Sequence, residues 1–170
     1  MSEHLPVVLT SEDFALLQNF TEYPAEPFPG AMDVVRRKLA NATVVFPADI
    51  GADVVTLNSR VRFSVNHGRV DERALVGGPS EEIYGLTLPL TTPRGLALIG
   101  ARIGQTVTAL RGDGWVERIH IEALPYQPEA HRSQPRLRVV SQHIRADIAT
   151  PGRTVRPAFF GDDDPGPSAA

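Results

Sequence analysis

The first forty residues carry hydrophobic positions at the spacing of an α-helix. Thr10 or Ser11 can cap a first helix, and a second helix is expected from Ala31 to about Ala40, ending at Asn41. The two apolar stripes are Phe14, Leu17 and Phe20, and Met32, Val35 and Leu39. The intervening TEYPAEPFPG contains three prolines, which exclude a helix there. The pattern predicts a helical hairpin that extends only about 15 Å, at about ten residues per helix.

From residue 53 the hydrophobic positions alternate, which is typical of β-strands. In VVTLNSRVRFSVN, one face of a predicted strand carries Val55, Leu57, Val61, Phe63 and Val65. Weaker patterns predict strands over 69–77 and 86–90, and a hairpin over 106–124 that turns at 112–114. These elements predict an α+β fold with a small antiparallel sheet of four or five strands.

The stretch TTPRGLALIG, residues 91–100, interrupts this series of strands. Pro93 suits the first position of a helix and Gly100 suits the position just after its end, so a helix of about two turns is expected. Asn58 and Ser59 also interrupt an apolar run, and we expect their side chains to bond neighbouring backbone in a structural role, since buried polar groups usually pair internally.

Composition limits the class of protein. The 170 residues suit one domain with or without an appendage, and the chain lacks a run of eighteen apolar residues and a secretory signal, so we expect a cytoplasmic protein that does not enter the membrane. With no cysteine, disulfides and thiolate metal sites are excluded. The formal charge of −3 argues against a dedicated surface for sequence-specific DNA binding.

Residues that carry chemistry do not gather into a recognisable catalytic pattern. The histidines are His4, His67, His120, His131 and His143, and no partner stands at metal-ligand spacing from any of them. The segment GGPSEE lacks a following helix and is expected to be a loop, because a phosphate-binding loop precedes a helix. We therefore expect a binding module without catalytic residues, metal or cofactor.

The pattern fades towards the C-terminus. Residues 131–170 are expected to form an extension, largely disordered from about residue 150, where proline, glycine and aspartate dominate. Phe159 and Phe160 stand beside three aspartates and admit a docking peptide, but a solvated tail is the favoured interpretation.

Three stretches together resemble the Rnk family, the bacterial regulators of nucleoside diphosphate kinase, which share a C-terminal domain with the transcript-cleavage factors GreA and GreB. They are DVVTLNSRVRF at 53–63, PRGLALIGARIGQTV at 93–107 and IEALPYQPEA at 121–130. The resemblance implies a short coiled-coil hairpin over 8–45 and an FKBP-like domain over 50–130. It also implies a protein that binds RNA polymerase near its secondary channel. We expect a monomeric, non-catalytic transcription regulator that competes with other factors there.

The resemblance also implies a binding site. In Gre factors, a Ser-Pro followed by a short apolar helix lies on the face that grips a coiled coil of the polymerase, and Thr92-Pro93 with RGLALIG match it here. We expect Thr92, Pro93 and Arg94 to contact the partner, and Leu98 and Ile99 to pack inward.

The predicted hairpin departs from the Gre pattern at its tip. Gre factors hold a catalytic metal ion with acidic residues at the tip of a longer coiled coil, whereas this tip carries only Glu22 and Glu26 among prolines. We therefore expect that the protein does not stimulate transcript cleavage.

Two alternatives remain open at this point. FKBP-like folds include peptidyl-prolyl isomerases, but residues 54–126 contain only four aromatic side chains, which is few for a proline-binding pocket: Phe63, Tyr84, Trp115 and Tyr126. The other alternative is direct regulation of nucleoside diphosphate kinase, for which the sequence holds no nucleotide-binding motif.

Overall fold

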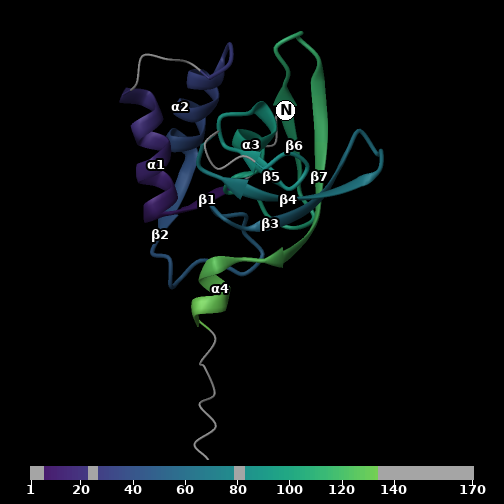
Figure 1. Ribbon diagram of the computed structural model, residues 1–170. Helices are drawn as coiled ribbons and strands as arrows, with labels where there is room; N and C mark the ends of the chain where they lie inside the picture. The colour runs from purple at the N-terminus through teal and green to yellow at the C-terminus, as the bar shows by residue number, and fades with distance from the viewer. Residues whose placement is uncertain (1–5, 23–26, 79–82, 134–170) are drawn as a thin grey trace, which may run out of the picture. The chain divides into compact units, whose positions relative to one another are not determined.

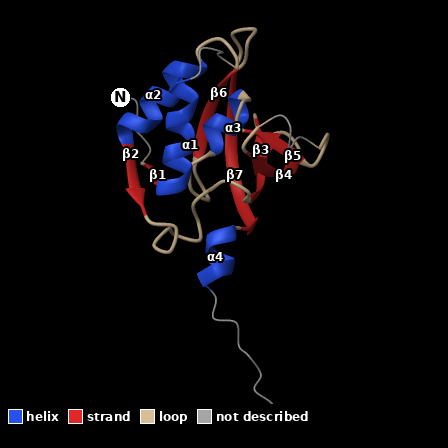
Figure 2. Ribbon diagram, turned by 60° about the vertical axis from the view of Figure 1, so that its left-hand side comes forward, coloured by secondary structure: helices blue, strands red, loops and turns tan. Residues whose placement is uncertain are grey.

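The computed structural model describes residues 6–22, 27–78 and 83–133, all within one compact unit that spans residues 1–136. The unit combines a pair of helices with two β-sheets, so the predicted α+β class is confirmed (Figure 1, Figure 2). Most of the predicted extension over 131–170 lies outside the described residues. In the described part of the chain, no helix has both the length and the apolar character needed to cross a membrane.

The N-terminal helices form the predicted hairpin, with α1 over Ser11–Glu22 and α2 over Ala31–Asn41. The Thr10 hydroxyl accepts a hydrogen bond from the Asp13 amide at 3.0 Å and so caps the start of α1. At the end of α2, the Asn41 side-chain amide donates to the Arg37 carbonyl at 2.7 Å. Local capping therefore fixes both helix boundaries close to the predicted positions.

A two-stranded parallel sheet at the base of the hairpin was not predicted. Its strands, β1 (Val7–Thr10) and β2 (Ala42–Val45), flank the two helices and pair in register from Val7 with Ala42 to Thr10 with Val45. The β1 backbone also reaches the main sheet region, because the Val8 amide donates to the Gly100 carbonyl at 3.0 Å. This short sheet thereby ties both ends of the hairpin to the rest of the unit.

The main sheet has five strands in the order β5-β4-β3-β7-β6. The strands are β3 (Arg60–Val65), β4 (Val70–Val76), β5 (Thr87–Pro89), β6 (Thr106–Leu110) and β7 (Val116–Tyr126). The expectation of an antiparallel sheet is wrong at one edge, because β5 runs parallel to β4. Residues 77–86 connect β4 to β5, and the structure describes 77–78 and 83–86 of this connection.

The prediction of a strand from residue 53 is wrong in its start, because β3 begins only at Arg60. A turn precedes it, in which the Ser59 amide donates to the Thr56 carbonyl and Asn58 adopts a left-handed φ of 62°. The Ser59 hydroxyl accepts from the Thr56 amide at 3.2 Å, and both residues are fully buried. The Ser59 side chain thus has the structural role expected for it, whereas Asn58 contributes to the break in the strand through its left-handed backbone.

The short helix α3 (Pro93–Leu98) packs against the inner face of the main sheet. Leu98 and Ile99 are fully buried, which confirms their predicted packing role. One continuous hydrophobic core joins them to Leu9, Leu17 and Val35 of the hairpin region. The hairpin and the sheet therefore share one core.

Lys38 of α2 provides a polar link between the hairpin and α3. Its ammonium group donates to the carbonyl oxygens of Ala97 at 3.1 Å and Ile99 at 2.6 Å, at the C-terminal end of α3. Burial lowers the pKa of Lys38 to about 7. The only lysine of the chain thus caps the carbonyl end of the short helix.

A second polar link connects α1 and the last helix, α4 (Pro128–Ser133), to the turn before β3. The Thr56 hydroxyl donates to the Glu129 carboxylate at 2.7 Å, and the Leu57 amide donates to the Asp13 carboxylate at 3.3 Å. Gln127 donates to the carbonyl oxygens of Gly51 at 2.9 Å and Val54 at 2.7 Å. These bonds hold the irregular segment before β3, where the alternating pattern predicts a strand.

Asp13 is a buried acidic group of this link that is only partly hydrogen-bonded. Its side chain is only 3% exposed, and its second carboxylate oxygen has no hydrogen-bond partner among the described residues. Burial is the largest cause that raises the pKa of Asp13 to about 6, and the nearby Glu129 and Glu12 raise it further. Ionised Asp13 therefore opposes folding at neutral pH.

We expect Asp13→Asn to raise the free energy of unfolding at pH 8 by about 1–3 kcal/mol and to change it little at pH 4. The folded-state pKa lies above the ordinary value, so the stability that protonated Asp13 contributes is present in acid and is lost as the pH rises through about 6. Asparagine stays neutral and keeps a carbonyl oxygen for the Leu57 amide. Urea unfolding between pH 4 and 8 measures the difference, with the exposed Asp33→Asn as control. An Asp13→Asn effect of equal size at both pH values would contradict this account.

Candidate functional site

The start of α3 is fixed by Thr92 and Pro93. The Thr92 hydroxyl accepts from the Gly95 amide at 3.1 Å and donates to the Pro89 carbonyl at 2.7 Å, which joins α3 to the end of β5. Pro93 occupies the first turn, where its missing N–H costs no helical bond. Thr92, Pro93 and Arg94 are each half-buried, so they lie at the surface on a rigid support.

Gly95 allows α3 to approach β5 closely. A Cβ atom at this position would overlap the Pro89 carbonyl oxygen and would lie 3.0 Å from the Leu90 Cα atom. Both obstacles are backbone atoms, which cannot rotate away as a side chain can. Only glycine therefore fits between Thr92-Pro93-Arg94 and the buried end of α3.

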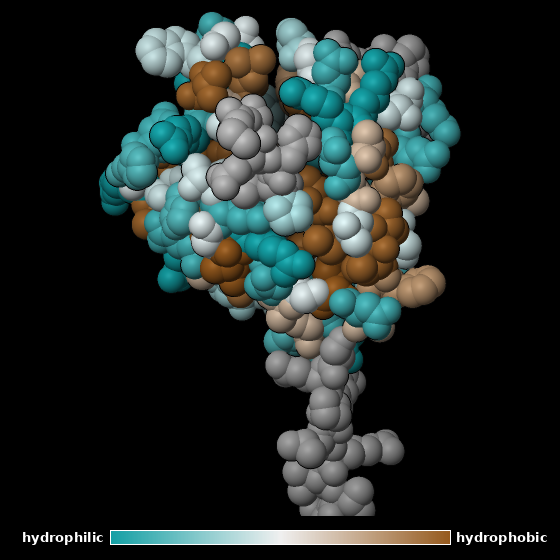
Figure 3. All heavy atoms as spheres, turned by 180° about the vertical axis from the view of Figure 1, so that it is seen from behind, coloured by the Kyte–Doolittle hydropathy of each residue, from teal (hydrophilic) through white to brown (hydrophobic). Residues whose placement is uncertain are grey.

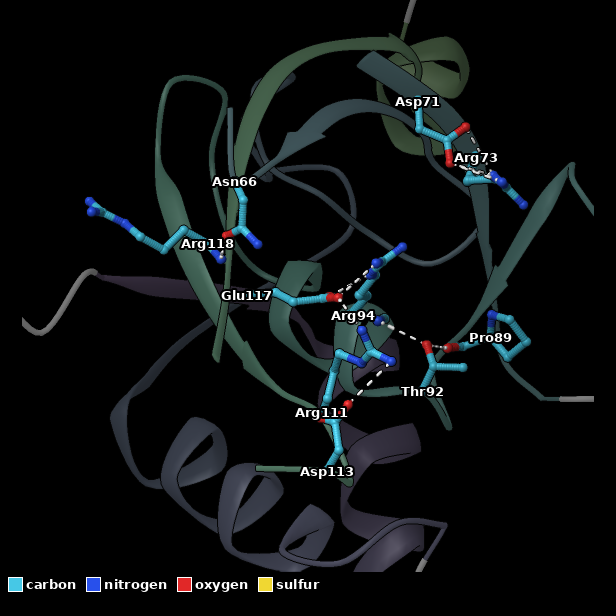
Figure 4. A network of polar contacts seen from close by, with 11 residues as sticks. Asn66, Asp71, Arg73, Pro89, Thr92, Arg94, Arg111, Asp113, Glu117 and Arg118 are labelled. Carbon is cyan, nitrogen blue, oxygen red and sulfur yellow. Dashed lines mark hydrogen bonds and ion pairs between the residues drawn. The ribbon is translucent and has the colours of Figure 1, made fainter. Parts of the chain in front are cut away.

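Arg94 crosses the inner face of the sheet to an ion pair with Glu117 of β7. Its guanidinium donates to the two carboxylate oxygens at 2.6 and 2.8 Å, a bidentate arrangement (Figure 4). Glu117 is only 5% exposed, whereas the Arg94 side chain remains 39% exposed. Hydrogen bonding to Arg94 lowers the pKa of Glu117, and the same bonds raise the pKa of Arg94.

Further charges surround this pair with alternating sign. Arg111 lies 3.7 Å from Glu117 and 3.4 Å from Asp113, at the turn between β6 and β7. On β4, the Arg73 guanidinium donates to Asp71 at 2.9 Å, and this bond is the largest cause that lowers the pKa of Asp71. The surface at the start of α3 is therefore polar, charge-balanced and ordered by ion pairs.

Pro93 also lines a groove between the hairpin and the main sheet. The groove has a volume of about 160 Å³. Its lining residues are Phe28, Pro29, Gly30, Asp33, Val34, Arg37, Pro93, Ala97, Thr108, Ala109 and Leu110. Leu110, at the end of β6, is 50% exposed. Trp115, in the turn between β6 and β7, is 73% exposed. The predicted contact residue Pro93 thus lies beside apolar surface that is available to a partner.

The structure brings together part of the predicted set. Thr92, Pro93 and Arg94 are adjacent at the start of α3. Glu22 is the exposed last residue of α1, and Glu26 lies outside the described residues. The predicted contact residues therefore lie at the start of α3, whereas the described hairpin-tip residue, Glu22, lies at the end of α1.

Sequence reasoning missed Glu117, which holds Arg94. The alternation on β7 carried a signal for it, because Glu117 shares its parity with Ile119 and Ile121, which are both fully buried. A carboxylate at an apolar position of a strand indicates a buried partner of opposite charge. That partner lies 23 positions away in the sequence, and its identity depends on the tertiary fold.

The comparisons with known proteins agree with the family resemblance inferred from the sequence. A regulator of nucleoside diphosphate kinase from Escherichia coli K12 is 30% identical over 125 residues, which cover 73% of this chain and 92% of that protein. The transcription elongation factor GreA of Thermodesulfovibrio yellowstonii is 31% identical over 80 residues, which cover 46% of this chain and 51% of that protein. No family model matches the chain.

A solved structure supports the same relationship. The GreA/GreB transcription elongation factor from Nitrosomonas europaea superimposes with a TM-score of 0.57 and 32% identity, over 71% of this chain and 98% of that one. The predicted resemblance is confirmed by the sequence of the Escherichia coli regulator and by the fold of the Nitrosomonas europaea factor. The chain belongs to the family of regulators of nucleoside diphosphate kinase and has a GreA/GreB-like fold.

Proposed function

We propose that this protein is a non-catalytic transcription regulator that binds RNA polymerase through Thr92, Pro93 and Arg94, near the secondary channel. The carrying observation is the capped, proline-fixed start of α3, displayed on a chain that shares 32% identity and its fold with a GreA/GreB factor. A rigid contact loses little conformational entropy when it binds. A coiled coil of the polymerase is the expected partner, and the action is expected in the cytoplasm.

The surface around Pro93 supports a partner with a mixed apolar and polar helix. The groove supplies Phe28 and Leu110 for apolar contact, while Arg94 and Arg111 stand beside it. Figure 3 shows that the face of the molecule seen from behind gathers hydrophobic side chains next to a hydrophilic band. We choose Pro93 as the contact because it lies on the capped, rigid start of α3 and because of the family relationship.

We also propose that residues 50–130 form an FKBP-like domain and residues 8–45 a short coiled coil. The support for the first is one short helix, α3, packed on the inner face of a five-stranded sheet. The isomerase activity found in some FKBP-like folds is not favoured. Phe63 lies in the core, while Tyr84 and Trp115 are 99% and 73% exposed on different connections, so they do not line one pocket.

An effect on nucleoside diphosphate kinase, as the relative's name states, is proposed to be indirect and to act through transcription. A pull-down with purified RNA polymerase core and purified nucleoside diphosphate kinase distinguishes the two partners. The proposal predicts retention of the polymerase alone. Retention of the kinase without the polymerase would overturn it.

We expect no stimulation of transcript cleavage above the polymerase's own rate. Cleavage needs carboxylates delivered to a metal ion inside the enzyme, and α1 with its 12 residues extends only about 18 Å at 1.5 Å per residue. Glu22 is the exposed last residue of α1, and we interpret it as a solubilising surface residue. Addition of the protein to backtracked elongation complexes measures the shortened RNA. Cleavage that is lost in the Glu22→Ala, Glu26→Ala double variant would contradict the prediction.

A further inference from the structure

We propose that the outer face of the main sheet, opposite α3, contains a binding pocket for a phosphate group. A cavity of about 200 Å³ is lined there by Ser64, His67, Thr106, Arg118 and His120, referred to below as the outer pocket. Its lining comes from three adjacent strands, β3, β7 and β6, and from one turn. None of the residues at the start of α3 lines it.

Strand register places three of these residues in one row. Ser64 of β3 and Thr106 of β6 both stand opposite His120 of β7. Arg118 lies two residues before His120 and therefore on the same face of β7. Figure 4 shows the Arg118 side chain directed away from Glu117, which points to Arg94 on the inner face. The outer pocket and the α3 site thus lie on opposite faces of one sheet.

The turn after β3 is held against β7 and brings His67 to the pocket. The Asn66 amide donates to the Arg118 carbonyl at 2.8 Å, and the Asn66 side-chain oxygen accepts from the Arg118 amide at 2.9 Å. Asn66 and His67 adopt left-handed φ values of 50° and 60°. Residues other than glycine rarely take this conformation, and it persists where surrounding contacts enforce it. The position of His67 is therefore built into the turn.

The lining side chains offer hydrogen-bond donors and positive charge, and none of them is a carboxylate. Within the described part of the chain, the Arg118 guanidinium has no ion-pair partner, and the side chains of Ser64 and His67 make no hydrogen bond. By contrast, Arg62 on the same sheet is paired with Glu72 at 2.9 Å. Ser64 is only 8% exposed, and its hydroxyl lines the pocket as a hydrogen-bond donor for a ligand.

His120 is oriented by its neighbour. The Thr106 hydroxyl lies 3.1 Å from the His120 Nδ1 atom. In the tautomer in which Thr106 donates this bond, the His120 Nε2 atom carries a hydrogen and becomes a donor. The pocket then combines a guanidinium, a hydroxyl and imidazole N–H groups, the groups that bind anionic oxygens.

A phosphate group fits this arrangement better than a carboxylate. Donors come from β3, β7 and the turn at His67, and a tetrahedral oxyanion presents oxygens in several directions whereas a carboxylate presents two. The chemistry is shared by inorganic phosphate and by a phosphate monoester. This proposal is independent of polymerase binding, because the outer pocket lies on the other face of the sheet from Pro93.

Titration of the full chain with inorganic phosphate at constant ionic strength, followed by amide NMR shifts, tests the pocket. Saturable shifts are expected at residues 64–67, 106 and 118–120. The exposed Arg118→Gln is expected to weaken binding roughly tenfold, since a charge-assisted hydrogen bond is lost, and Ser64→Ala is expected to weaken it several-fold. Arg132→Gln on α4 removes the same charge outside the pocket and is expected to leave the affinity unchanged.

A parallel titration with AMP distinguishes the two sources. Tighter binding of AMP identifies a phosphate monoester, and equal or weaker binding identifies inorganic phosphate. Thermal melting checks that each variant is folded, and Ser64→Ala serves if Arg118→Gln is not. Absence of saturable shifts with both ligands would overturn the proposal. So would equal weakening by Arg118→Gln and Arg132→Gln, because the attraction would then be general.

Discussion

Replacement of Gly95 by alanine is expected to lower the free energy of unfolding by about 3 kcal/mol, because the new methyl group would overlap the Pro89 carbonyl oxygen. The obstacle is backbone of the segment that also receives the Thr92 hydroxyl. Relief therefore requires α3 to move away from β5, and Leu96 and Leu98 would leave the core with it. Urea unfolding followed by circular dichroism measures the loss.

Gly112→Ala is the matched control for this substitution. Gly112 lies in the turn between β6 and β7, its backbone is outside the left-handed region, and a Cβ atom there would contact nothing within 4 Å. The free energy of unfolding of the Gly112→Ala variant is expected to differ from that of the unmodified protein by less than about 0.5 kcal/mol. Equal unfolding midpoints for Gly95→Ala and the unmodified protein would show that α3 does not pack against β5 as described.

Replacement of Pro93 by aspartate is expected to weaken polymerase binding by about 1–3 kcal/mol, roughly 5- to 150-fold in affinity. The new charge would be desolvated against an apolar partner beside Leu110. The fold is expected to survive, because an acidic residue in the first turn of a helix is favourable and Thr92 still caps α3. Titration of labelled protein with polymerase core measures the affinity.

Pro47→Asp provides the control for this binding experiment. Pro47 is also half-buried but lies in the loop after β2 and does not line the groove at Pro93. Its substitution is expected to leave the affinity unchanged. If Pro93→Asp bound as tightly as the unmodified protein while Leu98→Ala abolished binding without loss of stability, the division between contact and core residues would be reversed.

The elements that the sequence predicted correctly are those with local determinants. Thr92 caps α3 through Gly95, three residues on, and Pro93 occupies the first turn, so the whole signal lies within four positions. The hairpin of β6 and β7 similarly turns at residues 112–114, where Gly114 adopts a φ of 84°. Such features depend on the φ preferences and hydrogen bonds of adjacent residues, which are visible in a sequence.

The features that sequence reasoning missed depend on distant partners. β1 and β2 have four residues each and exist because Val7 and Ala42 are brought together by the hairpin between them. The turn before β3 is stabilised by Glu129, 73 positions away from Thr56. The alternating pattern predicts one strand through this turn, because the residues on both sides of the turn are apolar and buried.

The same division applies to the candidate site. Thr92 and Pro93 were predicted from local sequence and family resemblance, and both lie on the capped start of α3. Arg94 was predicted as a contact residue. Its ion pair with Glu117 could not be predicted from local sequence, because it depends on how α3 packs against β7. That pair makes Arg94 part of the support for the surface as well as an exposed member of it.

Displacement of labelled GreA from purified RNA polymerase core by this protein tests the central claim most directly. The unmodified chain is expected to displace GreA completely, and Pro93→Asp is expected to require a correspondingly higher concentration. GreA that remains bound while saturating amounts of the unmodified protein are present would contradict a shared docking site near the secondary channel.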